Sequence, residues 1–216
     1  MSQKLQIEVV SDFVCPWCYI GKKRLEQALE MCPDLDAEVV WQPFQLSPDM
    51  PREGRNKQEH YAEIFGTEKA QEIAGRMQQT GEEEGIAFGS SADAVSPNTL
   101  SAHVLLHWAA EDSAVDVAAL AERLFNEHHV NCSNIGDHAL LAEIAAEFGM
   151  DHQQVLDNLS AGKDEEAVKN RIRDAAARGV SGVPFFIVNG RYGLSGAQPP
   201  ELLAETFAKV VSERAG

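Results

Sequence analysis

The sequence predicts an α/β protein in which a β-α-β segment and a β-β-α segment frame an all-helical segment. Three observations support this prediction. A period-two apolar pattern near the N-terminus stops where a helix begins at Cys15, only helical periodicities follow from 45 to 182, and a hairpin signal precedes a last helix. Of the 216 residues, 44% are apolar and 24% are charged, which is ordinary for a globular protein, so disorder is not expected.

The first strand is predicted where Leu5, Ile7 and Val9 alternate with polar residues. The helix after it is expected from about Pro16 to Met31. Its buried face is predicted from residues that recur at spacings of three and four, which are Cys18, Gly21, Leu25, Ala28 and Cys32.

Prolines and glycines divide the middle of the chain. Pro33 ends the first helix, and residues 37–44 predict a second strand, parallel to the first. Pro48, Pro51 and Gly54 then interrupt any regular element, and only helical patterns follow. The expected helices are Lys57–Phe65, Glu68–Glu84, Pro97–Glu111, Val115–His128, His138–Phe148, His152–Leu159 and Glu165–Arg178.

Capping signals mark some of these helices. Ser96 with Pro97 is expected to begin one of them, and Asp137 and Asp151 are expected to cap two others.

The C-terminal segment regains strand character. Residues 183–188 predict a strand, and Asn189-Gly190 is a strong hairpin signal that leads to an antiparallel strand from Tyr192. A last helix is expected from Pro199-Pro200 to about Arg214. The predicted organisation is one α/β domain formed by 1–44 and 183–216, with an inserted helical domain from 45 to 182.

The strand-to-helix junction carries two cysteines three positions apart. If Cys15 is the N-cap, Pro16 takes the first helical position and Cys18 the third. Free N–H groups and the positive end of the helix dipole then favour a thiolate at Cys15, which is predicted to be the nucleophile. Cys18 lies one turn further along and is predicted to resolve mixed disulfides.

Two other interpretations of this pair are weaker. A four-cysteine zinc site is disfavoured because Cys32 and Cys132 form no second C-x-x-C. A purely structural disulfide would close a very small loop and would remove little entropy from the unfolded chain. Cys32 and Cys132 are expected to be a buried core thiol and a loop thiol that do not pair.

Residues near the pair have distinct expected roles. Trp17 lies inside a two-residue turn, so it is expected to form apolar surface for contact with partners. The charges of Lys22, Lys23 and Arg24 are expected to be solvated.

Two histidine pairs lie in the inserted segment. His103 and His107 have a spacing that can bind metal, but Val104 replaces the glutamate of H-E-x-x-H, so we expect packing or cleft lining and no metal. His128 and His129 are adjacent and are expected at a fraying helix end.

The motif Cys15-Pro16-Trp17-Cys18, together with Val183-Pro184, resembles the DsbA family of thioredoxin-fold oxidoreductases. The continuation Tyr19-Ile20-Gly21-Lys22, the start Pro97-Asn98-Thr99 and the segment Val188-Asn189-Gly190-Arg191-Tyr192 are similar to its FrnE-like branch. The resemblance implies a thioredoxin fold with an inserted helical domain, a cis Pro184 beside the cysteines, and substrate binding along Val183. It also implies that Asn98 lines the cleft.

The leading hypothesis is a thiol-disulfide oxidoreductase or isomerase that uses its own redox-active disulfide on protein or small thiols and needs no other cofactor. The alternative is a glutathione-dependent isomerase or a kappa-like glutathione transferase. In those enzymes a serine takes the place of Cys15, and an aspartate near the last helix helps to hold glutathione. Here the corresponding run is Ser195-Gly196-Ala197-Gln198, which weakens glutathione binding without excluding it. A non-enzymatic binding module is a third possibility, and it would leave the cysteine pair unused.

The charge and the absence of apolar spans narrow the expected partners. A net charge of −16 disfavours nucleic acid and anionic membranes. No apolar leader or span of ~20 apolar residues is found, so a cytoplasmic protein, monomeric or homodimeric, is expected. In the reducing cytosol its resting state is expected to be the dithiol.

Overall fold

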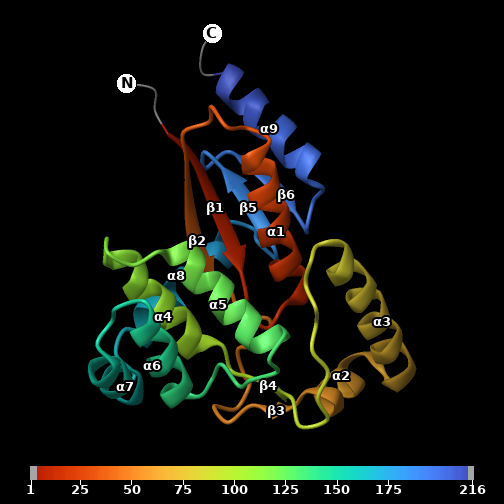
Figure 1. Ribbon diagram of the computed structural model, residues 1–216, viewed down its shortest axis with the longest axis vertical. Coiled ribbons are helices and arrows are strands. Elements are labelled where there is room, and N and C mark those ends of the chain that lie inside the picture. Colours follow the sequence, from red (N-terminus) through yellow and green to blue (C-terminus); the bar gives the residue numbers. More distant parts are fainter. Residues whose placement is uncertain (1–3, 214–216) are drawn as a thin grey trace. The chain divides into compact units, whose positions relative to one another are not determined.

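The computed structural model describes residues 4–213, and the chain divides into two compact units. One unit comprises residues up to 44 together with residues from 172 onward, and the other comprises 45–171. Figure 1 gives the order of the helices and strands along the chain.

The first unit contains a mixed sheet with strand order β2-β1-β5-β6. Its strands are β1 (Leu5–Ser11), β2 (Ala37–Pro43), β5 (Phe185–Val188) and β6 (Tyr192–Ser195). β1 runs parallel to β2 and antiparallel to β5, which is antiparallel to β6. The predicted β-α-β and β-β-α segments therefore join in one thioredoxin-like sheet, and the predicted fold class is confirmed.

Apolar side chains are buried on both faces of this sheet. Helices α1 (Pro16–Glu30) and α9 (Pro200–Ser212) pack against each other, as Figure 1 shows. The ring of Phe186 lies close to Gly21 of α1, whereas the next residue, Ile187, packs with Ala175 and Val180. Because neighbouring strand residues point to opposite faces, both faces of β5 are covered.

The second boundary between the units lies earlier than the sequence suggested. Helix α8 (Glu165–Ala177) continues past residue 171, where the helical unit ends. Ala175 and Val180 belong to the cluster of Val10, so the end of α8 is part of the sheet unit. The sequence placed this boundary at 182/183 because the helical periodicity carries no information about which neighbour a helix packs against.

The unit 45–171 is mainly helical, and its helices lie within a few residues of the predicted ranges. They are α2 (Lys57–Phe65), α3 (Thr67–Glu83), α4 (Leu100–Glu111), α5 (Val117–His129), α6 (His138–Glu147), α7 (His152–Ser160) and the first part of α8. A short antiparallel pair, β3 (Arg55–Asn56) and β4 (Val95–Ser96), was not predicted, because two residues are too few to show a period.

The capping predictions have mixed outcomes. Asp137 and Asp151 accept hydrogen bonds from backbone N–H groups at the starts of α6 and α7, as expected. The prediction that Ser96 and Pro97 begin a helix is wrong. Ser96 lies in β4, and α4 starts only at Leu100, whose N–H donates to Asn98 Oδ1 over 3.0 Å.

The prediction of a fraying helix end at His128 and His129 is also wrong. Both residues belong to α5 and are almost fully buried. The centres of the His129 and Phe88 rings lie 5.5 Å apart. The backbone carbonyl oxygen of His129 accepts a hydrogen bond from the Gly89 N–H. Contacts from a segment 40 positions away therefore fix this helix end, and a local pattern cannot reveal them.

Candidate active site

The two cysteines of the C-x-x-C motif occupy the positions predicted for them. Cys15 is the N-cap of α1, with an extended backbone, and Pro16 is the first helical residue. The N–H of Cys18 donates to the carbonyl oxygen of Cys15 over 3.0 Å. The Cys15 side chain makes no hydrogen bond to the first turn of the helix.

The chain returns to Cys15 at the start of β5. The Val183–Pro184 peptide bond is cis, as the resemblance implied. The Cys15 Sγ lies 3.8 Å from the carbonyl oxygen of Val183, a hydrogen-bonding distance for a thiol. The carbonyl oxygen of Pro184 accepts a hydrogen bond from Gly196, which anchors the proline to the hairpin.

Gly21 permits this close approach, a role that the sequence did not reveal. A Cβ atom at this position would lie 2.9 Å from Pro184 Cγ and 3.3 Å from Phe186 Cζ. Cβ atoms essentially never come within 3.0 Å of another heavy atom, and the proline ring cannot move aside like a flexible side chain. A glycine two turns after Cys15 therefore lets α1 pack directly on Pro184.

The two thiols differ in their surroundings. Cys18 is 1% exposed and Cys15 is 5% exposed. Burial raises the pKa of the Cys18 thiol well above its usual value, and hydrogen bonding and charge from Cys15 raise it further. Contacts with Ser11 and Asp12 act in the opposite direction without outweighing these effects. Cys18 therefore stays protonated at neutral pH.

Trp17 forms apolar surface beside the buried cysteines. Its side chain is 37% exposed, although its neighbours Cys15 and Cys18 are buried. This exposure agrees with the expectation that Trp17 does not belong to the core.

The expectation of solvated charges after the motif is wrong for Lys22. Its side chain is 3% exposed, and its Nζ lies 2.5 Å from Glu26 Oε1. Arg24 is also engaged, because it donates to the carbonyl oxygen of Ala197 over 2.7 Å. Lys22 is paired with a glutamate one helical turn further along α1, and Arg24 is bound to the backbone after β6. Neither side chain is therefore a free surface cation.

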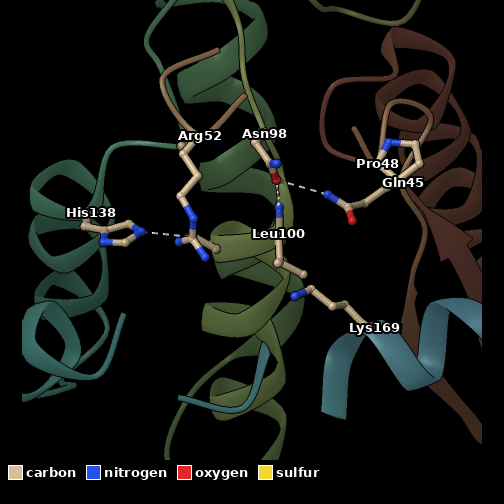
Figure 2. Close-up of a pocket in the computed structure, with 9 residues that line it drawn as sticks. Gln45, Pro48, Arg52, Asn98, Leu100, His138 and Lys169 are labelled. Atoms are coloured by element: carbon tan, nitrogen blue, oxygen red, sulfur yellow. Dashed lines mark hydrogen bonds between the residues drawn. The ribbon is translucent and has the colours of Figure 1, made fainter. Parts of the chain in front are cut away.

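A polar pocket of about 210 Å³ lies within the unit 45–171 and contains Asn98 (Figure 2). Asn98 Oδ1 accepts hydrogen bonds from Gln45 and from the Leu100 N–H, and its Nδ2 donates to the Met50 carbonyl oxygen over 2.7 Å. These bonds leave one amide N–H of Asn98 for a ligand. The resemblance indicated Asn98 alone, because the other lining residues lie far apart in the sequence.

The other cysteines and the histidine His107 form no metal cluster in the part of the chain that is described. Cys32 lies beyond the end of α1 and is half-buried, so the expectation of a fully buried core thiol is wrong. Cys132 is a half-buried loop thiol. His107 contacts Arg171 and Glu111, and residues 4–213 contain no cluster of three or more histidine, cysteine, aspartate or glutamate side chains suited to a metal ion.

A thioredoxin-like sheet with a C-x-x-C at a helix N-terminus beside a cis-proline defines a DsbA-like thiol oxidoreductase fold. The family model of the DSBA-like thioredoxin domain matches residues 6–208, and the chain belongs to this family.

Known relatives cover nearly the whole chain. The crystal structure of a probable DsbA oxidoreductase, SCO1869 from Streptomyces coelicolor, is 31% identical with a TM-score of 0.88, covering 97% of this chain and 91% of that one. An uncharacterized protein of Bacillus subtilis strain 168, YwbO, is 25% identical over 210 residues, which are 97% of this chain and 96% of its own length.

Other solved structures share the fold at lower identity. The cytosolic disulfide reductase DsbM from Pseudomonas aeruginosa, solved with GSH, is 19% identical with a TM-score of 0.67, covering 95% of this chain and 98% of its own. A 2-hydroxychromene-2-carboxylate isomerase is 16% identical with a TM-score of 0.71, covering 97% of this chain and 98% of its own.

Among the helices of residues 4–213, none is long and apolar enough to cross a membrane.

Proposed function

We propose that this protein is a thiol-disulfide oxidoreductase in which Cys15 is the nucleophile and Cys18 the resolving thiol. The observation that carries the proposal is the unequal environment of the two sulfurs. Cys15 lies at the N-terminus of α1, against the Val183 carbonyl oxygen, and Cys18 is buried in the first turn with a raised pKa. Burial disfavours negative charge at Cys18, whereas Cys15 lies at the N-terminal end of the helix dipole.

The exchange proceeds in two balanced steps. The Cys15 thiolate attacks one sulfur of a substrate disulfide, forms a mixed disulfide with it, and releases the other sulfur as a thiolate. Cys18 then loses its proton, attacks the Cys15 sulfur and releases the second substrate thiolate. The substrate gains two electrons, and the protein holds a Cys15–Cys18 disulfide. Two equivalents of an external thiol restore the dithiol: the first forms a mixed disulfide with Cys15 and releases Cys18, and the second releases Cys15 and leaves as a disulfide with the first. The proposed cycle uses no further cofactor.

Backbone and aromatic groups near Cys15 suit an extended substrate. In the proposed complex the backbone of Val183 pairs with the substrate strand, the Pro184 ring forms the floor, and Trp17 contacts apolar side chains of the substrate. The half-buried Val183 and the exposed Trp17 are accessible for such contacts. The net charge of −16 favours neutral or basic partners.

Glutathione is the proposed small thiol partner, and the cytoplasm the proposed location. DsbM, which shares the fold, is described as a cytosolic disulfide reductase and was solved with GSH. A FrnE-like assignment within the family agrees with the Pro97-Asn98-Thr99 start. The isomerase or transferase alternative is disfavoured because Cys15 and Cys18 supply their own thiol chemistry.

The test is disulfide reduction driven by dithiothreitol, with a mixed disulfide of glutathione and a peptide as the substrate. Cys15→Ser is expected to abolish turnover. Cys32→Ala is the matched control, since it also removes one thiol, and it is expected to leave the rate within about twofold, as for a substitution away from the machinery. Full turnover in Cys15→Ser would overturn the proposal.

A further inference from the structure

The pocket in the helical unit is lined by two cationic side chains and by several hydrogen-bonding groups. Its lining residues are Gln45, Pro48, Arg52, Asn98, Leu100, Ser101, Gly136, His138 and Lys169. Figure 2 shows His138 entering from one side and Lys169 from the other, with Asn98 and Leu100 between them. None of the lining side chains is acidic, although the chain as a whole has 34 acidic and 18 basic residues.

Glu165 partly neutralises the two cations of the pocket. The Nη2 atom of Arg52 lies 2.7 Å and 3.0 Å from the two carboxylate oxygens of Glu165, and Lys169 Nζ lies 3.4 Å from one of them. Glu166 also approaches Lys169, at 3.2 Å, but its side chain is 73% exposed and solvent screens it. Two cations therefore share one buried carboxylate.

Both cations keep donors that these ion pairs do not use. Glu165 engages only Nη2 of Arg52, so Nε and Nη1 remain for a ligand. An ammonium carries three N–H groups, and Lys169 directs two contacts at glutamates. Guanidinium and ammonium groups in this arrangement bind an oxyanion by charge-assisted hydrogen bonds.

The rest of the polar lining comprises the buried Ser101 and the half-buried Gln45, Asn98 and His138. Ser101 is 8% exposed, and its hydroxyl lies 2.9 Å from His138 Nε2. Asn98 holds Gln45 through a hydrogen bond of 3.1 Å, so the amide of Gln45 is fixed at the pocket wall. Ser101 is therefore a preorganised contact beside the two more exposed cations, Arg52 at 65% and Lys169 at 37% exposure.

We propose that this pocket binds the carboxylate of a small organic acid, with Arg52 and Lys169 as the anion-binding groups and Ser101 and Gln45 as polar contacts. A volume of about 210 Å³ is below the ~300–1,000 Å³ of pockets that accept drug-sized ligands, so the ligand is small. Binding requires no redox step, and the proposal is therefore independent of the chemistry of Cys15.

The test is a titration of the intact protein with succinate. Binding is measured by calorimetry and by the NMR resonances of the His138 ring. Succinamide, of similar size and without charge, is the control ligand, and inorganic phosphate distinguishes a carboxylate site from a general oxyanion site. Succinate is expected to bind. Arg52→Gln and Lys169→Gln are each expected to weaken it about tenfold, the usual effect of losing one charged hydrogen bond. Arg76→Gln on α3 makes the same charge change outside the pocket and is expected to change binding less than twofold.

His138 reports occupancy without a mutation. Burial and the charge of Arg52 lower the pKa of His138, whereas Asp137 and Glu165 raise it, and the Ser101 hydroxyl contacts the ring. A bound carboxylate favours the imidazolium, so the midpoint of the His138 titration is expected to rise with succinate and not with succinamide.

Equal binding of succinate and succinamide, or undiminished binding in Lys169→Gln, would overturn the proposal. Binding of phosphate without succinate would overturn the carboxylate assignment. If Arg52→Gln fails to fold, Lys169→Gln decides the question, since that side chain is 37% exposed and its removal leaves the Arg52–Glu165 pair intact.

Discussion

The sulfur of Cys15 lies 3.8 Å from the carbonyl oxygen of Val183, although 168 positions separate the two residues. This contact joins the start of α1 to the start of β5, and it places the proposed nucleophile beside backbone groups that can pair with a substrate. The sheet positions both ends of the contact, because β1 and β5 are hydrogen-bonded neighbours.

The close packing of α1 on Pro184 predicts the effect of a single methyl group. Gly21→Ala would place a Cβ atom 2.9 Å from Pro184 Cγ. Overpacking of this kind costs about 1–3 kcal/mol and outweighs the ~1 kcal/mol that alanine contributes in a helix interior. We expect a lower free energy of unfolding in urea, together with slower disulfide exchange.

Gly75→Ala is the matched control for this substitution. Gly75 lies inside α3, and a Cβ there would meet nothing within 4 Å. The Gly75→Ala substitution is expected to stabilise the protein by up to ~1 kcal/mol without altering the rate of disulfide exchange. If the two variants were equally stable, Gly21 would have no role in the approach to Pro184.

The end of α8 is held to the sheet by a charged pair. Arg178 donates two hydrogen bonds, of 2.8 Å and 2.9 Å, to Glu8 of β1, whose side chain is 10% exposed. Arg178→Met would leave this buried carboxylate with fewer donors, and we expect a loss of about 2 kcal/mol of unfolding free energy. Arg76→Met at an exposed site should change stability by less than ~0.5 kcal/mol. A loss no larger than that of the control would show that the pair does not stabilise the fold.

The lowered pKa of the Glu127 carboxyl group predicts that stability depends on pH. Burial by itself raises the pKa of Glu127, but hydrogen bonds from Ser133, Arg123 and Asn131 outweigh it and leave the pKa below its ordinary value. A lowered carboxyl pKa stabilises the folded state above the unfolded pKa of ~4.3, and this stabilisation is lost as the pH falls through the folded pKa. In urea titrations, the stability advantage of the native protein over Glu127→Gln should be constant from pH 7 to pH 5 and should shrink below pH 4. An advantage that grew on acidification would contradict this account.

The unequal thiols predict selective alkylation. Because burial and Cys15 raise the pKa of Cys18, that thiol carries little thiolate at neutral pH. With limiting iodoacetamide at pH 7, peptide mapping should find Cys15 labelled faster than Cys18, because the thiolate is the form that reacts. Faster labelling of Cys18 or of Cys32 would reverse the assignment of roles.

The dithiol could be predicted from the sequence because its chemistry is local. An N-cap cysteine, a proline and a second cysteine are consecutive signals at one helix start, and the Val183-Pro184 pair lies at a readable strand start. Helix ranges were also predictable, since each long helix carries a period of its own.

Features that depend on tertiary contact could not be predicted in this way. The spacing marks Gly21 only as a residue of the buried helix face, and it carries no sign that Pro184 packs against Gly21 or that Lys22 is buried. The pocket around Arg52 and His138 draws its lining from several elements with no common spacing. Such sites arise from packing, which no single stretch of sequence encodes.

The most direct test of the roles of the two cysteines is to trap the mixed disulfide. Cys18→Ser should be incubated with a peptide–glutathione disulfide, quenched with acid and analysed by mass spectrometry. With the resolving thiol removed, the account predicts that one adduct accumulates, with the substrate linked to Cys15 and with Cys32 and Cys132 unmodified. An adduct on Cys32 or Cys132, or no adduct under conditions in which the native protein turns over, would contradict it.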